Sequence, residues 1–207
     1  MVVAVILAAG RTVSDSQKTI NRTRIHFGFP ENSKPKCLFH YRGEVLLERQ
    51  ANVLRECEIS DIRVVVGYKK EMIEKFNEKM KLGLKLIFNP MWESDILTSH
   101  GWVKALDSVR AGLRGIEEDV LIILGDVWLE KEGLKKTLWD THPCVSVWHK
   151  HAAHIFKVSK EKLPLLNRLE GAGHNRPLHK FCMANGGVKL FTKIHDVDYY
   201  QMTDEGR

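Results

Sequence analysis

The sequence predicts a three-layer α/β sandwich with a mostly parallel sheet. Apolar runs rich in β-branched residues recur along the chain, and the clearest are Val2–Leu7, Ile62–Val66 and Val120–Leu124. Such runs are typical of strands that are buried on both faces, as parallel strands are when helices cover the sheet. Segments with apolar residues at helical spacing, among them 44–57 and 71–80, separate these runs. Strands that alternate with amphipathic helices indicate this fold class.

The first strand, Val2–Leu7, runs into a turn of small residues at 8–10, which Arg11 follows. A turn without side chains leaves main-chain N–H groups free to hold a phosphate, although an ordinary tight turn has the same composition. Residues 12–33 are mostly polar, and they predict a long mobile loop that covers a bound ligand.

The other expected elements follow from apolar periodicity and from Gly and Pro positions. In chain order they are a helix at 44–57, a strand at 62–66, a helix at 71–80, a strand at 84–88, a helix at 99–113, a strand at 120–124, strands at 144–148 and 154–158, a short helix at 163–169 interrupted by Pro164, a loop at 171–177 and a strand at 187–191. In the helix at 71–80, Met72, Ile73, Phe76 and Met80 are expected to face the core. We expect a single domain over 1–207, since this length can bury a sizeable core.

Composition excludes several classes of protein. No apolar run approaches the length of a membrane span, and residues 1–9 are too short for a signal peptide, so we expect a cytoplasmic protein without a membrane partner. The four cysteines are scattered without a Cys-x-x-Cys pair, which favours buried free thiols over a zinc site. The net charge of +6 fits a polyphosphate ligand at the positions of Arg11, Lys34 and Lys36, and a solvated basic surface is the alternative. A nucleic-acid partner is not expected, because no recognised motif and no face with interleaved Arg and aromatic residues is found.

Several motifs occur in an order that is more specific than any one of them. They are the apolar strand with its Leu7–Arg11 turn, Lys34-Pro35-Lys36, Gly43 before Leu46-Leu47, and Ile59–Tyr68. In this order they resemble the nucleotidyltransferases that make nucleoside-diphosphate sugars, cytidylyl-alcohols and related activated compounds. The resemblance implies a Rossmann-like sheet of the nucleotide-diphospho-sugar transferase type. It also implies a nucleotide-binding part over 1–130 and an acceptor-binding lobe over 140–190.

Asp126 directly follows an apolar strand and Gly125. Ligands of open α/β sheets bind at the carboxyl ends of the strands, so we expect Asp126, the turn at 8–11 and the segment 89–99 to converge. A carboxylate there is well placed to bind Mg²⁺ beside a phosphate, and a turn cap is the alternative. The resemblance implies the same metal role for Asp126. It implies a second ligand near the C-terminus, for which Asp198 is preferred over Asp196 and an acidic surface turn is the alternative.

The resemblance also assigns phosphate contacts and substrate-binding residues. Lys36 and Arg11 are expected to act with Asp126 in catalysis. The family has a second Gly before its Arg, which this chain lacks, so Arg22 or Arg24 is an alternative to Arg11. The residues expected to bind the nucleotide are Leu7, Ala8, Ala9, Gly10, Arg11, Lys36, Asn89, Thr98 and Ser99. Those expected to bind the acceptor are Trp128, Asn185 and Gly187, with core packing and a plain turn as the alternatives.

The resemblance thus implies a Mg²⁺-dependent nucleotidyltransferase that joins an NMP from an NTP to an alcohol phosphate or sugar phosphate and releases pyrophosphate. CTP is preferred, because residues 89–99 resemble a segment of molybdenum-cofactor nucleotidyltransferases and phosphocholine cytidylyltransferases. One alternative is a metal-dependent, GT-A-like glycosyltransferase, against which the absence of Asp-x-Asp at 126–128 counts. The other is a non-catalytic, nucleotide-binding regulatory domain.

Overall fold

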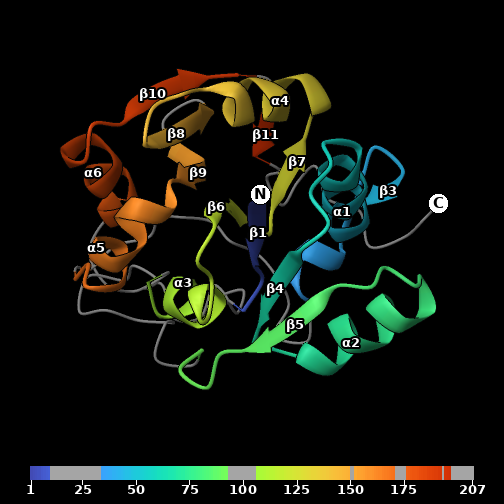
Figure 1. The fold of residues 1–207 in the computed structure, drawn as a ribbon. Helices are drawn as coiled ribbons and strands as arrows, with labels where there is room; N and C mark the ends of the chain where they lie inside the picture. Colours follow the sequence, from blue (N-terminus) through green and yellow to red (C-terminus); the bar gives the residue numbers. More distant parts are fainter. Residues whose placement is uncertain (10–33, 93–105, 150–151, 171–175, 193, 197–207) are drawn as a thin grey trace, which may run out of the picture.

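A seven-stranded sheet forms the middle layer of the structure, which is a computed structural model (Figure 1). The residues that it describes are 1–9, 34–92, 106–149, 152–170, 176–192 and 194–196. Across the sheet the strands are β10 (Val188–Phe191), β8 (Cys144–His149), β9 (Ala152–Val158), β6 (Asp119–Leu124), β1 (Val2–Leu7), β4 (Ile62–Val66) and β5 (Lys85–Phe88).

Most neighbouring strands of this sheet are parallel. β1 pairs in parallel with β4 on one side and with β6 on the other, so that Leu7 lies opposite both Val65 and Leu124. Within the described sheet, only β9 is antiparallel to its neighbours, β6 and β8. The mostly parallel sheet predicted from the sequence is therefore confirmed, and the strands of the 140–190 segment extend this same sheet.

Helices cover both faces of the sheet (Figure 1). One face carries α1 (Leu46–Glu56), α2 (Lys70–Lys79) and α4 (Lys131–Trp139), and the other carries α3 (Leu106–Leu113), α5 (Leu163–Asn167) and α6 (Arg176–Ala184). Two separate hydrophobic clusters lie between these layers and the sheet. The predicted three-layer sandwich is confirmed.

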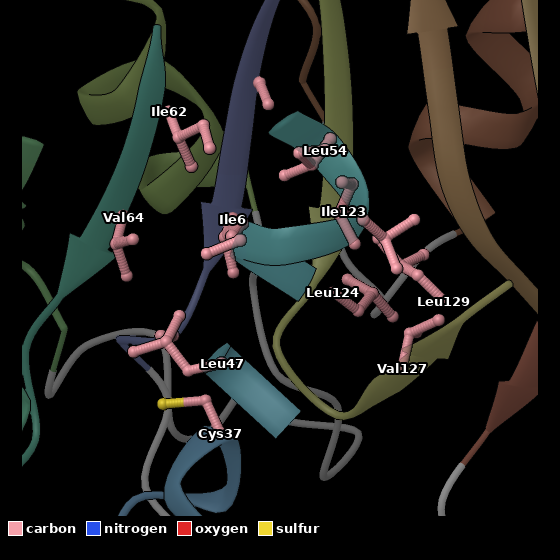
Figure 2. Packing of buried hydrophobic residues seen from close by; sticks show 14 of the residues in the cluster. Ile6, Cys37, Leu47, Leu54, Ile62, Val64, Ile123, Leu124, Val127 and Leu129 are labelled. Carbon is pink, nitrogen blue, oxygen red and sulfur yellow. The ribbon is translucent and has the colours of Figure 1, made fainter. Parts of the chain in front are cut away.

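The two clusters follow from the alternation of side chains along each strand. In β1, Ala4 and Ile6 belong to the cluster under α1, whereas Val3 and Val5 belong to the cluster under α3. Figure 2 shows the first cluster, in which residues of α1 such as Leu54 lie with side chains of β1, β4 and β6. Burial on both faces is the reason why β1, β4 and β6 are almost entirely apolar.

The helix predicted from residue 44 begins two residues later. Glu44 and Val45 form β3 (Glu44–Val45), which pairs with β2 (His40–Tyr41) in a short hairpin. The turn residues Arg42 and Gly43 have φ angles of 52° and 83°, and left-handed conformation at both positions is typical of a type I′ hairpin turn. Gly43 therefore serves the hairpin rather than the start of the helix.

Three further predictions about helices are corrected. Pro164 lies in the first turn of α5 and does not interrupt it, because a proline there removes no intrahelical hydrogen bond. The loop predicted over 171–177 overlaps the start of α6, which includes Pro177. Met80, expected to face the core, is 38% exposed because α2 ends at Lys79.

The structure adds elements that the sequence did not predict. They are α4, α6, β7 (Val127–Leu129), β11 (Ile194–Asp196) and the short 3₁₀ helices η2 (Lys36–Leu38) and η4 (Lys160–Lys162). The predicted helix over 99–113 is seen as α3 from Leu106, and 99–105 lie outside the described residues. Within the described part of the chain, no helix has the length and apolar character needed to cross a membrane.

Candidate functional site

The carboxyl ends of β1, β4 and β6 meet at one edge of the sheet. The main-chain N–H of Gly125 donates to the carbonyl oxygen of Leu7 at 3.1 Å, and that of Tyr68 donates to Ala9 at 3.1 Å. The residues that follow β1 therefore lie between the ends of its two neighbours. Ala8 and Ala9 are 8% and 1% exposed, so the start of the small-residue turn is packed into this edge.

Two glycines allow these close approaches. A Cβ atom at Gly125 would lie 2.8 Å from the carbonyl oxygen of Leu7, a backbone atom that cannot easily move. A Cβ atom at Gly67 would lie 2.4 Å from Cβ of Trp92 and 2.9 Å from the carbonyl oxygen of Ala9. Larger residues at either position would push the strand ends apart.

Lys36 and Asp126 form an ion pair at this edge. The ammonium nitrogen of Lys36 lies 3.2 Å from Oδ2 of Asp126, and the two side chains are 31% and 20% exposed. Pro35 precedes the 3₁₀ turn of Lys36–Leu38 and fixes the backbone that leads into it. The residue expected to bind phosphate and the residue expected to bind the metal thus come together from positions 90 residues apart.

Cys37 follows Lys36 and is buried beside Gly125, where an added Cβ atom would lie 3.5 Å from Cβ of Cys37. Its side chain is 1% exposed, and burial, reinforced by the negative charge of Asp126, raises the pKa of its thiol to about 12. Because the thiolate is the nucleophilic form of cysteine, Cys37 has no nucleophilic character near neutral pH.

Gln50 is a site residue that the sequence analysis missed. Its side chain is fully buried, and Nε2 donates to the carbonyl oxygens of Leu124 at 3.0 Å and Val127 at 2.8 Å. The signal was present in the sequence, since Gln50 falls on the same helical face as Leu46, Leu47 and Leu54. A polar residue on an apolar face indicates a buried hydrogen-bonding partner.

Asn89 lies at the same edge, immediately after β5, with its side chain 1% exposed. Its Nδ2 donates to Oγ of Ser108 at 3.0 Å, and its Oδ1 accepts from the N–H of Met91 at 3.0 Å. The second bond is an Asx turn, which gives Asn89 a structural role beside the expected nucleotide contact. Gly10, Arg11, Arg22, Arg24, Thr98 and Ser99 lie outside the described residues.

Trp128 is 4% exposed and packs with Phe39 and Leu46. Its Nε1 donates to Oε1 of Glu130 at 3.0 Å, and the guanidinium of Arg49 lies 4.9 Å from its ring centroid. These contacts give Trp128 a packing role, and its acceptor-binding role stays a prediction.

Asn185 and Gly187 make their contacts around the end of α6. Nδ2 of Asn185 donates to the carbonyl oxygen of Phe181 at 2.9 Å. A Cβ atom at Gly187 would lie 2.4 Å from the carbonyl oxygen of Cys182. These contacts are structural, and the acceptor-binding role of both residues stays a prediction.

The C-terminal acidic segment approaches Asp126 through the backbone. β11 pairs antiparallel with β7, and this register sets Asp196 opposite Val127, the residue after Asp126. Asp198 lies outside the described residues. Among the residues that are described, no group of three or more His, Cys, Asp and Glu side chains could hold a metal ion.

Comparison with known proteins identifies the family. A profile described as "MobA-like NTP transferase domain" matches residues 4–186. The chain belongs to this family. The predicted relationship to nucleotidyltransferases, and with it the enzyme class, is thereby confirmed. No curated protein sequence matches the chain.

Solved structures of other proteins share the fold at low sequence identity. The CTP:phosphocholine cytidylyltransferase of Streptococcus pneumoniae is 20% identical with a TM-score of 0.61, and the match covers 97% of this chain and 95% of that one. The inositol-1-phosphate CTP transferase of T. maritima is 12% identical with a TM-score of 0.62, covering 97% and 91%. The manganese complex of Rv0371C from Mycobacterium tuberculosis is 16% identical with a TM-score of 0.58, covering 96% and 93%.

Proposed function

We propose that the chain transfers a nucleoside monophosphate from an NTP to a phosphorylated small-molecule acceptor and releases pyrophosphate. The observation that carries this proposal is the pairing of Lys36 with Asp126, 3.2 Å apart at the carboxyl edge of the sheet. A cation for phosphate oxygens and a carboxylate for a divalent metal are the two groups that the reaction needs side by side.

The residues at this edge fit a Mg²⁺ ion. Asp126 presents a partly exposed carboxylate, and the register of β11 brings the backbone of the acidic C-terminal segment beside it. Mg²⁺ is usually held by one or two carboxylates together with water and substrate phosphates, so a protein cluster of three ligands is not required. Asp126 would hold the ion, with Asp198, preferred over Asp196, as the second ligand. When bound, the ion neutralises negative charge on the phosphates.

The protein's own contribution is to position two anions and to balance their charge. Lys36 pairs with phosphate oxygens of the NTP, and the turn that begins at Ala8 supplies backbone N–H groups. A phosphate oxygen of the acceptor forms the new bond to the α-phosphorus, while the bond from the α-phosphorus to the oxygen of the β-phosphate breaks. The leaving group is pyrophosphate. The acceptor phosphate is already ionised, so neither a general base nor a nucleophilic side chain takes part.

CTP is the preferred nucleotide and an alcohol phosphate the preferred acceptor. Two proteins of similar fold carry CTP in their names, together with phosphocholine in one and inositol 1-phosphate in the other. Manganese in a third supports a divalent metal. A cytoplasmic location stays a prediction.

The test is pyrophosphate release from each of the four NTPs with phosphocholine, inositol 1-phosphate or glucose 1-phosphate. The reactions contain Mg²⁺, Mn²⁺ or EDTA. We expect release that needs an NTP, an acceptor and a metal. NTP binding without pyrophosphate release under any condition would instead support the regulatory domain. Release of a nucleoside diphosphate from a sugar nucleotide would support the glycosyltransferase.

A further inference from the structure

The turn that carries Asp126 is tied to α1 by one side chain. Nε2 of Gln50 donates to the carbonyl oxygens of Leu124 and Val127, at 3.0 Å and 2.8 Å. These are the residues on either side of Gly125 and Asp126. Both amide hydrogens of Gln50 are thus used to hold the two ends of a single turn.

An amide at this position is unusual for its surroundings. Leu46, Leu47 and Leu54, its neighbours on the same helical face, are 0% exposed, as is Gln50 itself. Within the described part of the chain, Oε1 of Gln50 has no hydrogen-bond partner. A buried polar atom without a partner is unfavourable. An apolar residue at position 50 would avoid this cost, so the presence of Gln is explained by the two hydrogen bonds that its Nε2 donates to the turn.

A third hydrogen bond fixes the turn from the other side. The N–H of Gly125 donates to the carbonyl oxygen of Leu7 at the end of β1. The main chain that carries the Asp126 carboxylate is therefore held by α1 and by β1 at once. Without Gln50, both bonds from α1 to the carbonyl oxygens of Leu124 and Val127 would be lost, and the turn would no longer be held from the side of this helix.

We propose that Gln50 is a positioning residue, which fixes the turn of Asp126 so that its carboxylate is set for the metal and the phosphates. This inference rests on the proposed function. Residues that orient a metal ligand typically change metal affinity about 10- to 100-fold when they are replaced. Gln50 acts through Asp126 and touches no substrate in this scheme.

The test compares Gln50→Met with a matched control, Thr137→Val. Met has nearly the length and volume of Gln but no donor. Thr137 is also 0% exposed, and its Oγ1 donates to the carbonyl oxygen of Gly133 at 3.0 Å within α4. Each variant therefore removes buried hydrogen bonding, but only Gln50→Met releases the turn of Asp126. The readouts are the Kd for Mn²⁺ by electron paramagnetic resonance, the KM for Mg²⁺, kcat and the melting temperature.

We expect Gln50→Met to weaken Mn²⁺ binding about 10- to 100-fold and to raise the KM for Mg²⁺ more than it lowers kcat. Thr137→Val is expected to lower the melting temperature without changing the Kd. If Gln50→Met does not fold, Gln50→Asn carries the test, since its shorter amide cannot reach both carbonyls, and a smaller loss of Mn²⁺ affinity is expected.

The outcomes separate the two proposals. A folded Gln50 variant that binds Mn²⁺ as tightly as the unmodified chain overturns the positioning role and leaves the proposed function intact. If the unmodified chain itself binds no Mn²⁺ and no Mg²⁺, the proposed function fails, and the positioning role fails with it.

Discussion

The ammonium of Lys36 lies 3.2 Å from the carboxylate of Asp126, so the expected phosphate-binding cation and the expected metal-binding anion neutralise each other. A metal on Asp126 and a phosphate on Lys36 each compete with this ion pair. A metal bound to Asp126 frees Lys36 for the phosphate, and a phosphate bound to Lys36 frees Asp126 for the metal. The two binding events are therefore cooperative.

Lys36→Met should therefore change metal and nucleotide affinity in opposite directions. We expect Mn²⁺ to bind up to about fivefold more tightly without nucleotide, because a partly exposed ion pair contributes up to about 1 kcal/mol. NTP binding should weaken about tenfold or more, since a hydrogen bond to a charged group contributes about 1.5–3 kcal/mol. Calorimetry with Mn²⁺ and with each NTP measures both effects.

Lys34→Met is the matched control for this prediction. Lys34 precedes the same 3₁₀ turn, but its ammonium lies over the ring of Phe39, 5.1 Å from the centroid. The variant loses the same charge without releasing Asp126, so metal affinity should change little. Equal changes in the two variants would show a general effect of net charge and contradict the coupling.

Asp126→Asn should abolish metal-dependent pyrophosphate release and keep the fold. The amide retains the size of the carboxylate but binds Mg²⁺ poorly, because hard cations prefer charged oxygen ligands. The Asp126 side chain is 20% exposed and its ion pair with Lys36 is partly exposed to water, so the free energy of unfolding should change by no more than about 1 kcal/mol. Urea unfolding measures the stability of the variant, and a pyrophosphate assay measures its activity. A folded and active variant would show that the metal assignment is wrong.

The topology of the site could be predicted from the sequence because it follows from local patterns. Apolar runs located β1, β4 and β6, and the rule that ligands meet the carboxyl ends of parallel strands brought Asp126 to the turn after β1. The predicted and observed limits of β1 and β4 are identical, since each run ends abruptly at small or polar residues.

The missed elements depend on information that a local window does not hold. β7 and β11 are three residues each and exist only because they pair across the chain. α6 was missed because Pro177 suggested a loop, although proline is favoured in the first turn of a helix. The role of Gln50 was missed because its partners, Leu124 and Val127, are 74 and 77 residues away.

Cys37 should resist alkylation in the folded protein. Burial raises the pKa of this thiol to about 12, so almost no thiolate is present at about pH 8. Treatment of the folded protein with iodoacetamide, followed by peptide mass spectrometry, should find Cys57 modified before Cys37, because Cys57 is only half-buried. Rapid modification of Cys37 under folding conditions would contradict this packing and restore a nucleophile to the candidate site.

The same thiol predicts a loss of stability in alkali. In the unfolded chain Cys37 ionises near its ordinary pKa of 9.0, whereas in the folded chain it stays protonated to about pH 12. The folded state binds the extra proton in this window, so the free energy of unfolding falls as the pH rises from about 9 toward 12. Cys37→Ala should reduce this dependence relative to the unmodified chain, with urea unfolding at several pH values as the measurement.

For His179 we expect the free energy of unfolding to rise with pH in the acid range, the opposite of the dependence expected for Cys37. Its Nδ1 lies 3.0 Å from Oγ of Ser146, which accepts a hydrogen bond from Nε1 of Trp148 at 3.2 Å. The single hydroxyl hydrogen of Ser146 can bond either Nδ1 or the carbonyl oxygen of Val188, which lies 3.4 Å from Oγ. The bond to Nδ1 needs the neutral ring. Burial, and then the charge of Lys189, lowers the pKa of His179.

Stability should therefore fall as the pH drops below about 6.5, where the unfolded histidine takes up a proton that the folded one does not. Between the lowered folded pKa and the ordinary pKa of about 6.5, the unfolded state binds more protons than the folded state. The contribution of His179 to the free energy of unfolding is therefore complete above about pH 6.5 and is lost as the pH falls to the folded pKa. His179→Gln should flatten the decline in melting temperature between about pH 7 and pH 5. Ten histidines are present, so only the difference between variant and unmodified chain reports on this one. An unchanged slope would mean that the ring is protonated in the folded protein and that Ser146 bonds to the carbonyl oxygen of Val188 instead.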